Sequence, residues 1–400
     1  MVAWREGDPP GGRRFVDVGP LDLEAGGSLP GARVAYETWG TPRRGADGTV
    51  ANAVLVEHAL TGDSHVVGPA GPGHPSPGWW DGVVGPGLAV DTDRWFVVAA
   101  NVLGGCQGTT GPASPAPDGR AWGSRFPHVS VRDQVGVEAR LADALGVRRW
   151  SLVVGGSMGG MRALEWAVGL PGRVERCVVL ASCAAASGDQ LAWCAPQLAA
   201  ITGDPAWRGG DYHDGPDEGP VTGLGVARRI AHVTYRSRWE MDTRFGRDAQ
   251  DGEDPLVGGR YAVESYLDHQ AGKLARRFDA GSYVLLTRAM NGHDVGRGRG
   301  GVAAALGRVR ARTTVVGVDS DRLYPTEQQE ELAALVPGAR YVLVTSRFGH
   351  DGFLVETAQV ARALADALAD ADADDSGDDS GDDSDDDSAG EAAAPCGVAG

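Results

Sequence analysis

Residues 150–170 read WSLVVGGSMGGMRALEWAVGL, and this stretch decides the fold. Its first part, 150–154, is a short apolar run without alternation, which is typical of a strand buried on both faces of a sheet. Its last part has the apolar spacing of a helix, which we expect at about 160–169. The motif between them, Gly155-Gly156-Ser157-Met158-Gly159, has the GxSxG pattern of a serine nucleophile held in a strand–turn–helix unit. The stretch therefore predicts that Ser157 is a nucleophile at the carboxyl end of a strand.

The residues beside Ser157 fit this interpretation. Gly155 and Gly159 lack a Cβ atom, so neighbouring chain segments can approach the turn closely. The amide of Met158 would stand at a helix N-terminus and point at a developing oxyanion. A bare GxSxG match is weak evidence in a chain with 61 glycines, and an ordinary glycine-rich turn is the alternative. The strand before the motif and the helix after it favour the nucleophile.

Similar apolar runs recur on both sides of the motif, and we expect further strands there, at 31–39, 53–57, 95–100, 176–181, 313–318 and 340–344. Apolar spacing near 3.6 predicts a helix at 132–145, and another helix is expected at about 354–369. Apolar strands separated by helices predict an α/β fold with a mostly parallel central sheet and helices on both faces.

The chain divides into segments of different character. Between 186 and 305 no convincing core strand occurs, so we expect a helical lid insertion between two parts of the core, 1–185 and 306–369. The segment 370–400 is expected to be a disordered acidic tail, because it repels itself and cannot bury apolar surface. Residues 370–391 carry twelve Asp or Glu and no Lys or Arg. Without them the net charge of −17 falls to −5, so the folded body is only mildly acidic.

Composition argues against several classes of protein. No apolar run reaches the length of about 18 residues that a membrane helix needs, and the first thirty residues do not resemble a signal peptide. No basic patch suggests a nucleic-acid partner. The five cysteines are odd in number and lack CxxC spacing, which favours reduced core thiols over a thiol nucleophile or a metal site. We therefore expect a cytoplasmic protein without a metal site.

A serine hydroxyl needs a base, and in this kind of fold the chain order is serine, acid, histidine. His350 is the histidine that follows the last expected strand, so order alone selects it, with His293 as the alternative. The acid should follow the strand at 313–318, where both Asp319 and Asp321 stand. Spacing does not separate these two, and the other would serve as a turn or capping residue.

A second oxyanion donor usually comes from the loop after an earlier strand. Here that loop is HALTGDSH, residues 58–65, and the amide of Leu60 is the candidate. An ordinary strand-end loop remains an equal alternative at this point. A non-catalytic binding module on the same scaffold would predict an incomplete triad, whereas serine, acid and histidine are all present in order.

Taken together, segments spread over nearly the whole chain outside the tail resemble the homoserine O-acetyltransferase family, which has the α/β-hydrolase fold. They are HALTG at 58–62, NVLGGC at 101–106, RFP at 125–127, GGSMGGM at 155–161, ARRIA at 227–231, DSDRLYP at 319–325 and HDGFL at 350–354. Two of the patterns, NVLGGCQGTTGP and GHDGFL, are much more specific than GxSxG.

The resemblance implies roles that spacing leaves open. It implies that Asp321 is the catalytic acid, that the Leu60 amide is an oxyanion donor, and that Arg228 and Asp351 bind substrate. An arginine can hold the α-carboxylate of homoserine with two hydrogen bonds, and an aspartate can accept from its ammonium or hydroxyl group. By sequence alone, Arg228 would be read as a solvated helix residue.

The resemblance also implies an activity in methionine biosynthesis. An acetyl group would pass from the cosubstrate acetyl-CoA to Ser157 and then to the hydroxyl of L-homoserine, giving CoA and O-acetyl-L-homoserine by a ping-pong mechanism. It implies a homodimer formed through the lid and no tightly bound cofactor. Three alternatives use the same triad, namely a homoserine O-succinyltransferase, a serine O-acyltransferase and an esterase-type hydrolase. The TGDSH segment at 61–65 favours the acetyl donor.

Overall fold

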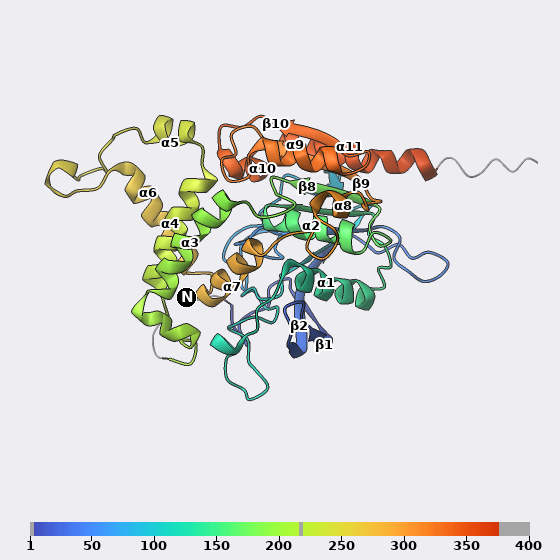
Figure 1. Ribbon diagram of the computed structural model, residues 1–400, viewed down its shortest axis with the longest axis horizontal. Helices are drawn as coiled ribbons and strands as arrows, with labels where there is room; N and C mark the ends of the chain where they lie inside the picture. Colours follow the sequence, from blue (N-terminus) through green and yellow to red (C-terminus); the bar gives the residue numbers. More distant parts are fainter. Residues whose placement is uncertain (1–3, 216–218, 376–400) are drawn as a thin grey trace, which may run out of the picture.

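The computed structural model describes residues 4–215 and 219–375 (Figure 1). An eight-stranded sheet with the order β1-β2-β6-β3-β7-β8-β9-β10 forms the centre. Its strands are β1 Arg14–Asp22, β2 Ser28–Trp39, β3 Ala53–Glu57, β6 Phe96–Ala100, β7 Leu152–Gly156, β8 Arg176–Leu180, β9 Arg312–Val318 and β10 Arg340–Val344. Strand β2 pairs antiparallel with β1 and β6, and every later pair is parallel. The predicted mostly parallel sheet is confirmed.

Both faces of the sheet are covered, which explains the apolar runs without alternation. Neighbouring residues of one strand enter opposite cores: Val179 of β8 packs in one cluster and Val178 in the other. The first cluster includes residues of helices α1 (Val131–Leu145), α2 (Met158–Gly169), α8 (Val302–Leu306) and α9 (Thr326–Leu335). The second includes residues of α11 (Thr357–Asp375).

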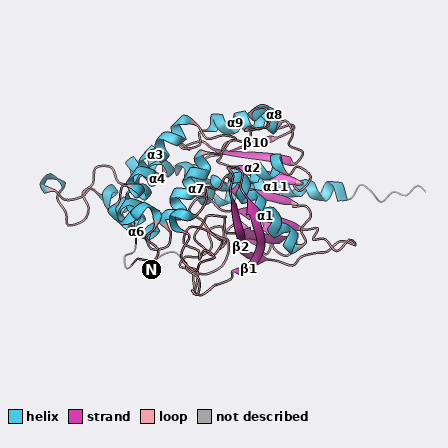
Figure 2. Ribbon diagram, turned by 60° about the horizontal axis from the view of Figure 1, so that its bottom comes forward, coloured by secondary structure: helices cyan, strands magenta, loops and turns pink. Residues whose placement is uncertain are grey.

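The helices of the lid follow β8 and lie beyond one end of the sheet (Figure 2). They are α3 Gly188–Thr202, α4 Val221–Tyr235, α5 Arg238–Arg244, α6 Ala262–Ala275 and α7 Ala280–Asn291. Helix α4 packs between α3 and α6. A third apolar cluster joins this lid to the core, with Met158 and Leu60 on the core side and Leu224 and Tyr283 on the lid side.

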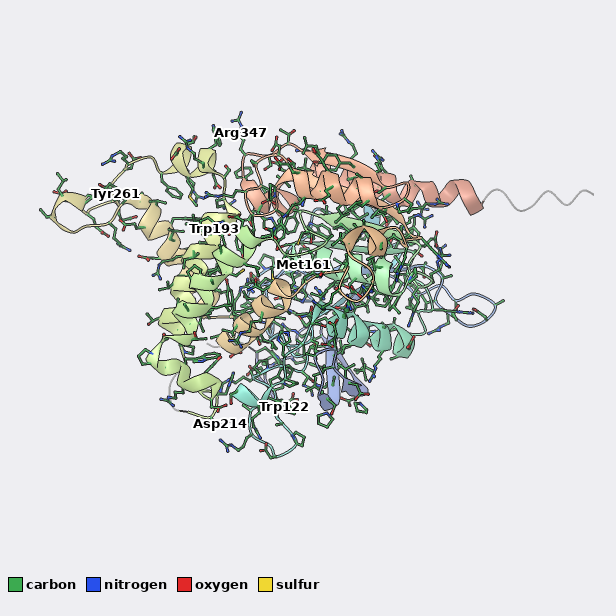
Figure 3. The ribbon with its side chains drawn as sticks, viewed as in Figure 1. Trp122, Met161, Trp193, Asp214, Tyr261 and Arg347 are labelled. Carbon is green, nitrogen blue, oxygen red and sulfur yellow. The ribbon has the colours of Figure 1, made fainter. Side chains whose placement is uncertain are left out.

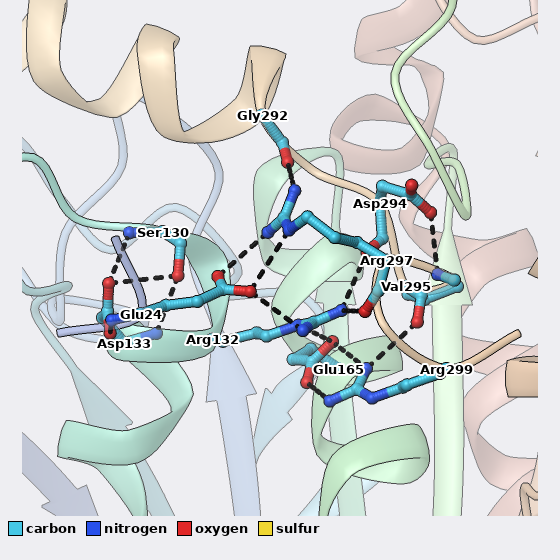
Figure 4. A network of polar contacts seen from close by, with 11 residues as sticks. Glu24, Ser130, Arg132, Asp133, Glu165, Gly292, Asp294, Val295, Arg297 and Arg299 are labelled. Atoms are coloured by element: carbon cyan, nitrogen blue, oxygen red, sulfur yellow. Dashed lines mark hydrogen bonds and ion pairs between the residues drawn. The ribbon is translucent and has the colours of Figure 1, made fainter. Parts of the chain in front are cut away.

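Ion pairs hold the segment that follows α7, where the chain passes from the lid back to the core (Figure 4). Glu24 pairs with Arg132 at 2.9 Å and with Arg297 at 2.9 Å. Nearby, an Arg299 Nη1–H donates to Glu165 Oε2 at 2.8 Å. Since Arg132 and Glu165 belong to α1 and α2, the return segment is anchored to the core before the predicted end of the insertion at 305.

The predicted start of the acidic tail, residue 370, differs from the structure. Helix α11 runs to Asp375, so the tail expected from residue 370 begins inside this helix. Alanine, the strongest helix former, alternates with aspartate there and continues the helix past the predicted boundary. Residues 376–400, the rest of the predicted tail, lie outside the described residues.

The other expected strands and helices agree with the structure to within a few residues, but several elements were missed. Two of them, β4 Val84–Gly85 and β5 Val90–Asp91, pair as a separate two-stranded sheet. The edge strand β1 and the helix α9 were not predicted. Among the described residues, no helix is both long and apolar enough to span a membrane.

Candidate active site

Ser157 occupies a strained turn between β7 and α2. Its backbone has φ 57° and ψ −123°, a conformation that costs a non-glycine residue about 1–3 kcal/mol. A Cβ added to Gly159 would lie 2.1 Å from the carbonyl oxygen of Glu57, and one added to Gly155 would lie 2.3 Å from the Gly159 backbone. The flanking glycines are therefore required by close approach of the backbone, as the motif predicts.

The base and acid candidates meet at the carboxyl ends of the strands. His350 lies in a short 3₁₀ turn, η4 Gly349–Asp351, and its Nδ1 is 2.7 Å from Asp321 Oδ2. The other oxygen, Asp321 Oδ1, accepts from the amides of Leu323 and Tyr324 at 2.8 and 2.9 Å. These two bonds fix the carboxylate, so it can hold the imidazole in one orientation.

The second acid candidate has a different role. Asp319 Oδ1 accepts from the amide of Ser346 at 2.9 Å and so joins the ends of β9 and β10. The alternative histidine is also elsewhere: His293 is buried, with Nε2 at 3.2 Å from the carbonyl oxygen of Cys183. Burial lowers the pKa of His293 to about 4. The geometry thus separates Asp321 and His350 from both alternatives.

The surroundings of His350 raise its pKa. Burial alone would lower it, but the charge and hydrogen bond of Asp321, together with the charge of Asp351, outweigh burial. The rings of Tyr324, Phe353 and Tyr235 surround the imidazole, with centroids 5.1, 5.4 and 5.8 Å away. A neutral imidazole is needed to accept a proton, so this shift has a kinetic consequence.

We expect kcat/KM to fall as the pH drops through the raised pKa of His350. The protonated imidazole cannot accept the serine proton, so the midpoint of the acid limb should lie above 6.5, the ordinary histidine value. A pH profile of kcat/KM between acidic and alkaline limits measures it. A midpoint below 6.5 would contradict the expectation.

Ser157 and His350 line one cavity of about 210 Å³, together with Leu60, Arg228 and Asp351. Asp321 does not itself line this cavity, but it is hydrogen-bonded to His350, which does. Met158, the residue after Ser157, is fully buried. No hydrogen bond joins Ser157 to His350 among the contacts of the described residues. Such bonds are often long without substrate and tighten when it binds.

The two amides expected to bind an oxyanion come from different segments of the chain. Met158 begins α2, and Leu60 lies in the loop after β3. Within the described part of the chain, neither amide N–H has a hydrogen-bond acceptor. Both side chains pack in the apolar cluster beneath the lid, which holds the two loops together.

The candidate substrate ligands have unequal surroundings. Arg228, on α4, donates through Nη1 to Thr61 Oγ1 at 3.4 Å, and its Nε is buried without a partner among the described residues. Asp351 Oδ2 lies 3.5 Å from Nε of Arg236. Burial raises the pKa of Asp351, and the charges of Arg236, His350 and Arg228 offset only part of that rise. A basic and an acidic group thus face the same cavity, as a zwitterionic substrate requires.

The sequence analysis did not predict a buried network of ion pairs that includes Glu57, a residue of the cavity wall. Arg162, on α2, is fully buried and lies 2.6 Å from Glu57 and 2.6 Å from Glu138. Its Nη2 also donates to the carbonyl oxygen of His58 at 2.6 Å. Arg162 therefore links the nucleophile helix to the loop that carries Leu60. Nothing in the spacing of these residues along the chain indicates the network.

Arg277, Trp79 and Tyr235 also line the cavity and were not predicted. Beside it lies a second, more apolar hollow that shares Leu60 and Tyr235 with the first. Trp193 of α3 and Met161 of α2, both labelled in Figure 3, line this hollow from the lid and from the core.

One group of described side chains has the composition of a metal site. Ligand atoms of Glu37, His65 and His74 lie within 4.8 Å of one another, and all three residues are buried. However, Nε2 of His74 accepts from the Gly12 amide at 3.0 Å, and His65 Nδ1 lies 3.2 Å from Glu37 Oε2. The nearby positive charge of Arg13 also disfavours a cation. We assign no metal to this cluster.

The described cysteines are all free: Cys106, Cys177, Cys183 and Cys194. Burial raises the pKa of Cys177 and of Cys183 to about 12, so neither is a ready thiolate nucleophile. Cys396 lies outside the described residues.

Comparison with known proteins finds relatives that cover most of the chain. The alpha/beta hydrolase fold family matches residues 52–357. The homoserine O-acetyltransferase of Thermobifida fusca is 67% identical over 361 residues, which cover 90% of this chain and 94% of that protein. The crystal structure of homoserine O-acetyltransferase from Bacillus anthracis superposes with a TM-score of 0.81 at 25% identity, covering 89% of this chain and 97% of that one. That of esterase E22 has a TM-score of 0.80 at 26% identity, covering 89% and 99%.

Proposed function

This chain belongs to the homoserine O-acetyltransferases, a family with the alpha/beta hydrolase fold, and we propose that it moves an acetyl group from acetyl-CoA to L-homoserine through an acetyl-serine at Ser157. Its products are CoA and O-acetyl-L-homoserine, an intermediate of methionine biosynthesis. The observation that supports the proposal best is the Asp321–His350 pair, at 2.7 Å, on the wall of the cavity that also contains Ser157.

In the first half-reaction, His350 Nε2 takes the proton of Ser157 while the serine oxygen attacks the thioester carbon of acetyl-CoA. Asp321 stabilises the imidazolium that forms. Negative charge develops on the carbonyl oxygen, where the unpaired amides of Leu60 and Met158 would donate hydrogen bonds. The tetrahedral intermediate then breaks its C–S bond, and the CoA sulfur leaves with the proton from His350.

In the second half-reaction, homoserine occupies the cavity with its carboxylate on Arg228 and its ammonium on Asp351. Its hydroxyl attacks the acetyl-serine carbonyl, and His350 takes the hydroxyl proton. Collapse of the second tetrahedral intermediate returns the proton to Ser157 and releases the ester. Water must be kept from the acetyl-enzyme, and the lid helices over the sheet end support such exclusion.

Steady-state kinetics with two donors and two acceptors test the function. Acetyl-CoA and succinyl-CoA are each combined with homoserine and serine, and CoA release is followed. We expect the highest kcat/KM for acetyl-CoA with homoserine. Higher values for succinyl-CoA or for serine would instead assign one of the other two acyltransferase activities.

An esterase is the second candidate, because esterase E22 shares the fold with a TM-score of 0.80. The two activities differ in what attacks the acetyl-enzyme. Measured at one homoserine concentration, a transferase delivers acetyl to homoserine in preference to water, although water is in large excess. Acetate as the main product, unchanged by added homoserine, would identify a hydrolase.

Replacement of Arg228 with glutamine should weaken homoserine binding. A hydrogen-bonded charged group contributes about 1.5–3 kcal/mol, so the KM for homoserine should rise roughly ten- to hundredfold. The matched control is Arg229→Gln, one residue along α4, where the guanidinium pairs with Asp268 at 2.7 Å near the surface. Acetylation of the enzyme by acetyl-CoA should change little in either variant. Equal KM values in the two variants would remove Arg228 from the substrate site.

We also infer a cytoplasmic homodimer formed through the lid. Four free and largely buried cysteines support a reducing compartment. The arm between α5 and α6 projects from the molecule (Figure 1) and carries the apolar side chains of Leu256 and Val257, which are 91% and 83% exposed. Such exposed apolar residues support an interface on the lid.

A further inference from the structure

The cavity contains a second guanidinium that neither the mechanism nor the sequence motifs use. Arg277 lies between α6 and α7 and lines the cavity with Ser157 and Arg228. Among the described residues, its guanidinium has no carboxylate within ion-pairing distance and no hydrogen-bond acceptor. A largely buried cation without a partner is costly unless an anion joins it.

Hydrogen bonds hold the backbone of Arg277 in place on both sides of the residue. Its amide donates to the Leu274 carbonyl at 2.9 Å, and its own carbonyl accepts from Gln107 Nε2 at 2.9 Å. Gln107 Oε1 in turn accepts from Arg13 at 2.9 Å. The following residue, Phe278, is buried in the cluster beneath the lid. The backbone of Arg277 is therefore fixed, whereas the guanidinium at the end of its side chain has no partner among the described residues.

The electrostatic surroundings indicate the sign of the missing partner. Burial lowers the pKa of Arg277, and the positive charge of Arg228 lowers it further, against the opposite effect of Asp63. Two like charges that face one cavity repel each other until an anion lies between them. The acidic residues that line the cavity have other cationic neighbours: Asp351 lies next to Arg236, and Glu57 pairs with Arg162.

We propose that Arg277 and Arg228 together bind the α-carboxylate of homoserine, with Arg277 as a specificity-determining residue for amino-acid acceptors. This inference rests on the proposed function and adds a residue to it. The phosphates of CoA are a less suitable partner. The long pantetheine arm separates them from the thioester, which must reach Ser157 inside a cavity of only about 210 Å³.

The test compares two acceptors in the full-length enzyme. One is homoserine, and the other is the aminopropanol in which hydrogen replaces the α-carboxylate. For Arg277→Met, kcat/KM should fall roughly ten- to hundredfold with homoserine and change little with the aminopropanol. Arg277→Lys, which keeps the charge, should recover part of the loss. The neighbouring exposed residue supplies the matched control, Arg276→Met, which should leave both values unchanged.

Each other outcome contradicts the proposal. An equal loss with both acceptors would mean that Arg277 only supports the fold or the acetyl-enzyme. A rise in the KM for acetyl-CoA, absent with a short acetyl thioester that lacks the phosphates, would assign Arg277 to CoA. If Arg277→Met does not fold, Arg277→Lys provides the same comparison of acceptors. Failure of the proposed function itself is distinguishable, because the unmodified enzyme would then not acetylate homoserine.

Discussion

Replacement of Ser157 with alanine is expected to lower kcat by roughly four to six powers of ten. The substitution removes the oxygen that forms the acetyl-enzyme, and no described cysteine can replace it, because burial raises the thiol pKa of each. The loss of kcat is measured as the rate of CoA release by the purified enzyme with acetyl-CoA and homoserine as substrates.

The fold should survive this change. The side chain of Ser157 has no hydrogen bond among the described residues, and alanine keeps the Cβ that the turn already accommodates. Thermal unfolding and acetyl-CoA binding serve as controls. A Ser157→Ala enzyme that folded normally and kept even a tenth of the original kcat would rule out a nucleophilic serine at this position.

Replacement of Asp321 with asparagine should lower kcat by about four powers of ten. The amide can still accept from the Leu323 and Tyr324 amides, but it cannot stabilise the imidazolium and can hold His350 in the wrong tautomer. Loss of the negative charge should also lower the pKa of His350, so the acid limb of the pH profile should move to lower pH.

Asp319→Asn is the matched control for this change. The asparagine side chain would keep an oxygen to accept from the Ser346 amide, and Asp319 is not hydrogen-bonded to His350. We expect the kcat of this variant to stay within a few-fold of the original. A larger loss in Asp319→Asn than in Asp321→Asn would reverse the assignment of the catalytic acid.

Much of the fold was predictable because the central strands are buried on both faces. Strands β3 and β8 each contain four consecutive apolar residues, and the expected limits of β3 agree with the structure. Strand β1 was missed because it lies at the sheet edge, where polar and apolar residues mix. Helix α9 was missed because it is polar over most of its length and buries few residues.

The candidate site could be proposed from the sequence where chain order or local turns carry the information. Ser157 follows from the turn it occupies, and His350 from its place after the last strand. The choice of Asp321 over Asp319 needed the family resemblance, since both follow β9. The structure separates them by their hydrogen-bond partners.

The remaining cavity residues could not be read from the sequence. Arg277 lies about 120 residues after Ser157, and only the path of the lid brings the two to one cavity. Arg162 is fully buried between two carboxylates, and the sequence analysis did not single it out. Contacts of this kind depend on tertiary packing, and no local pattern encodes them.

The acetyl-serine intermediate can be detected directly by mixing the enzyme with acetyl-CoA alone, quenching with acid and analysing the protein by mass spectrometry. If Ser157 is the nucleophile, the amount of free CoA should equal the amount of enzyme, and the protein should gain one acetyl group on the peptide that contains Ser157. Turnover with homoserine by an enzyme that forms no acetyl adduct, or an adduct on any other residue, would contradict this role of Ser157.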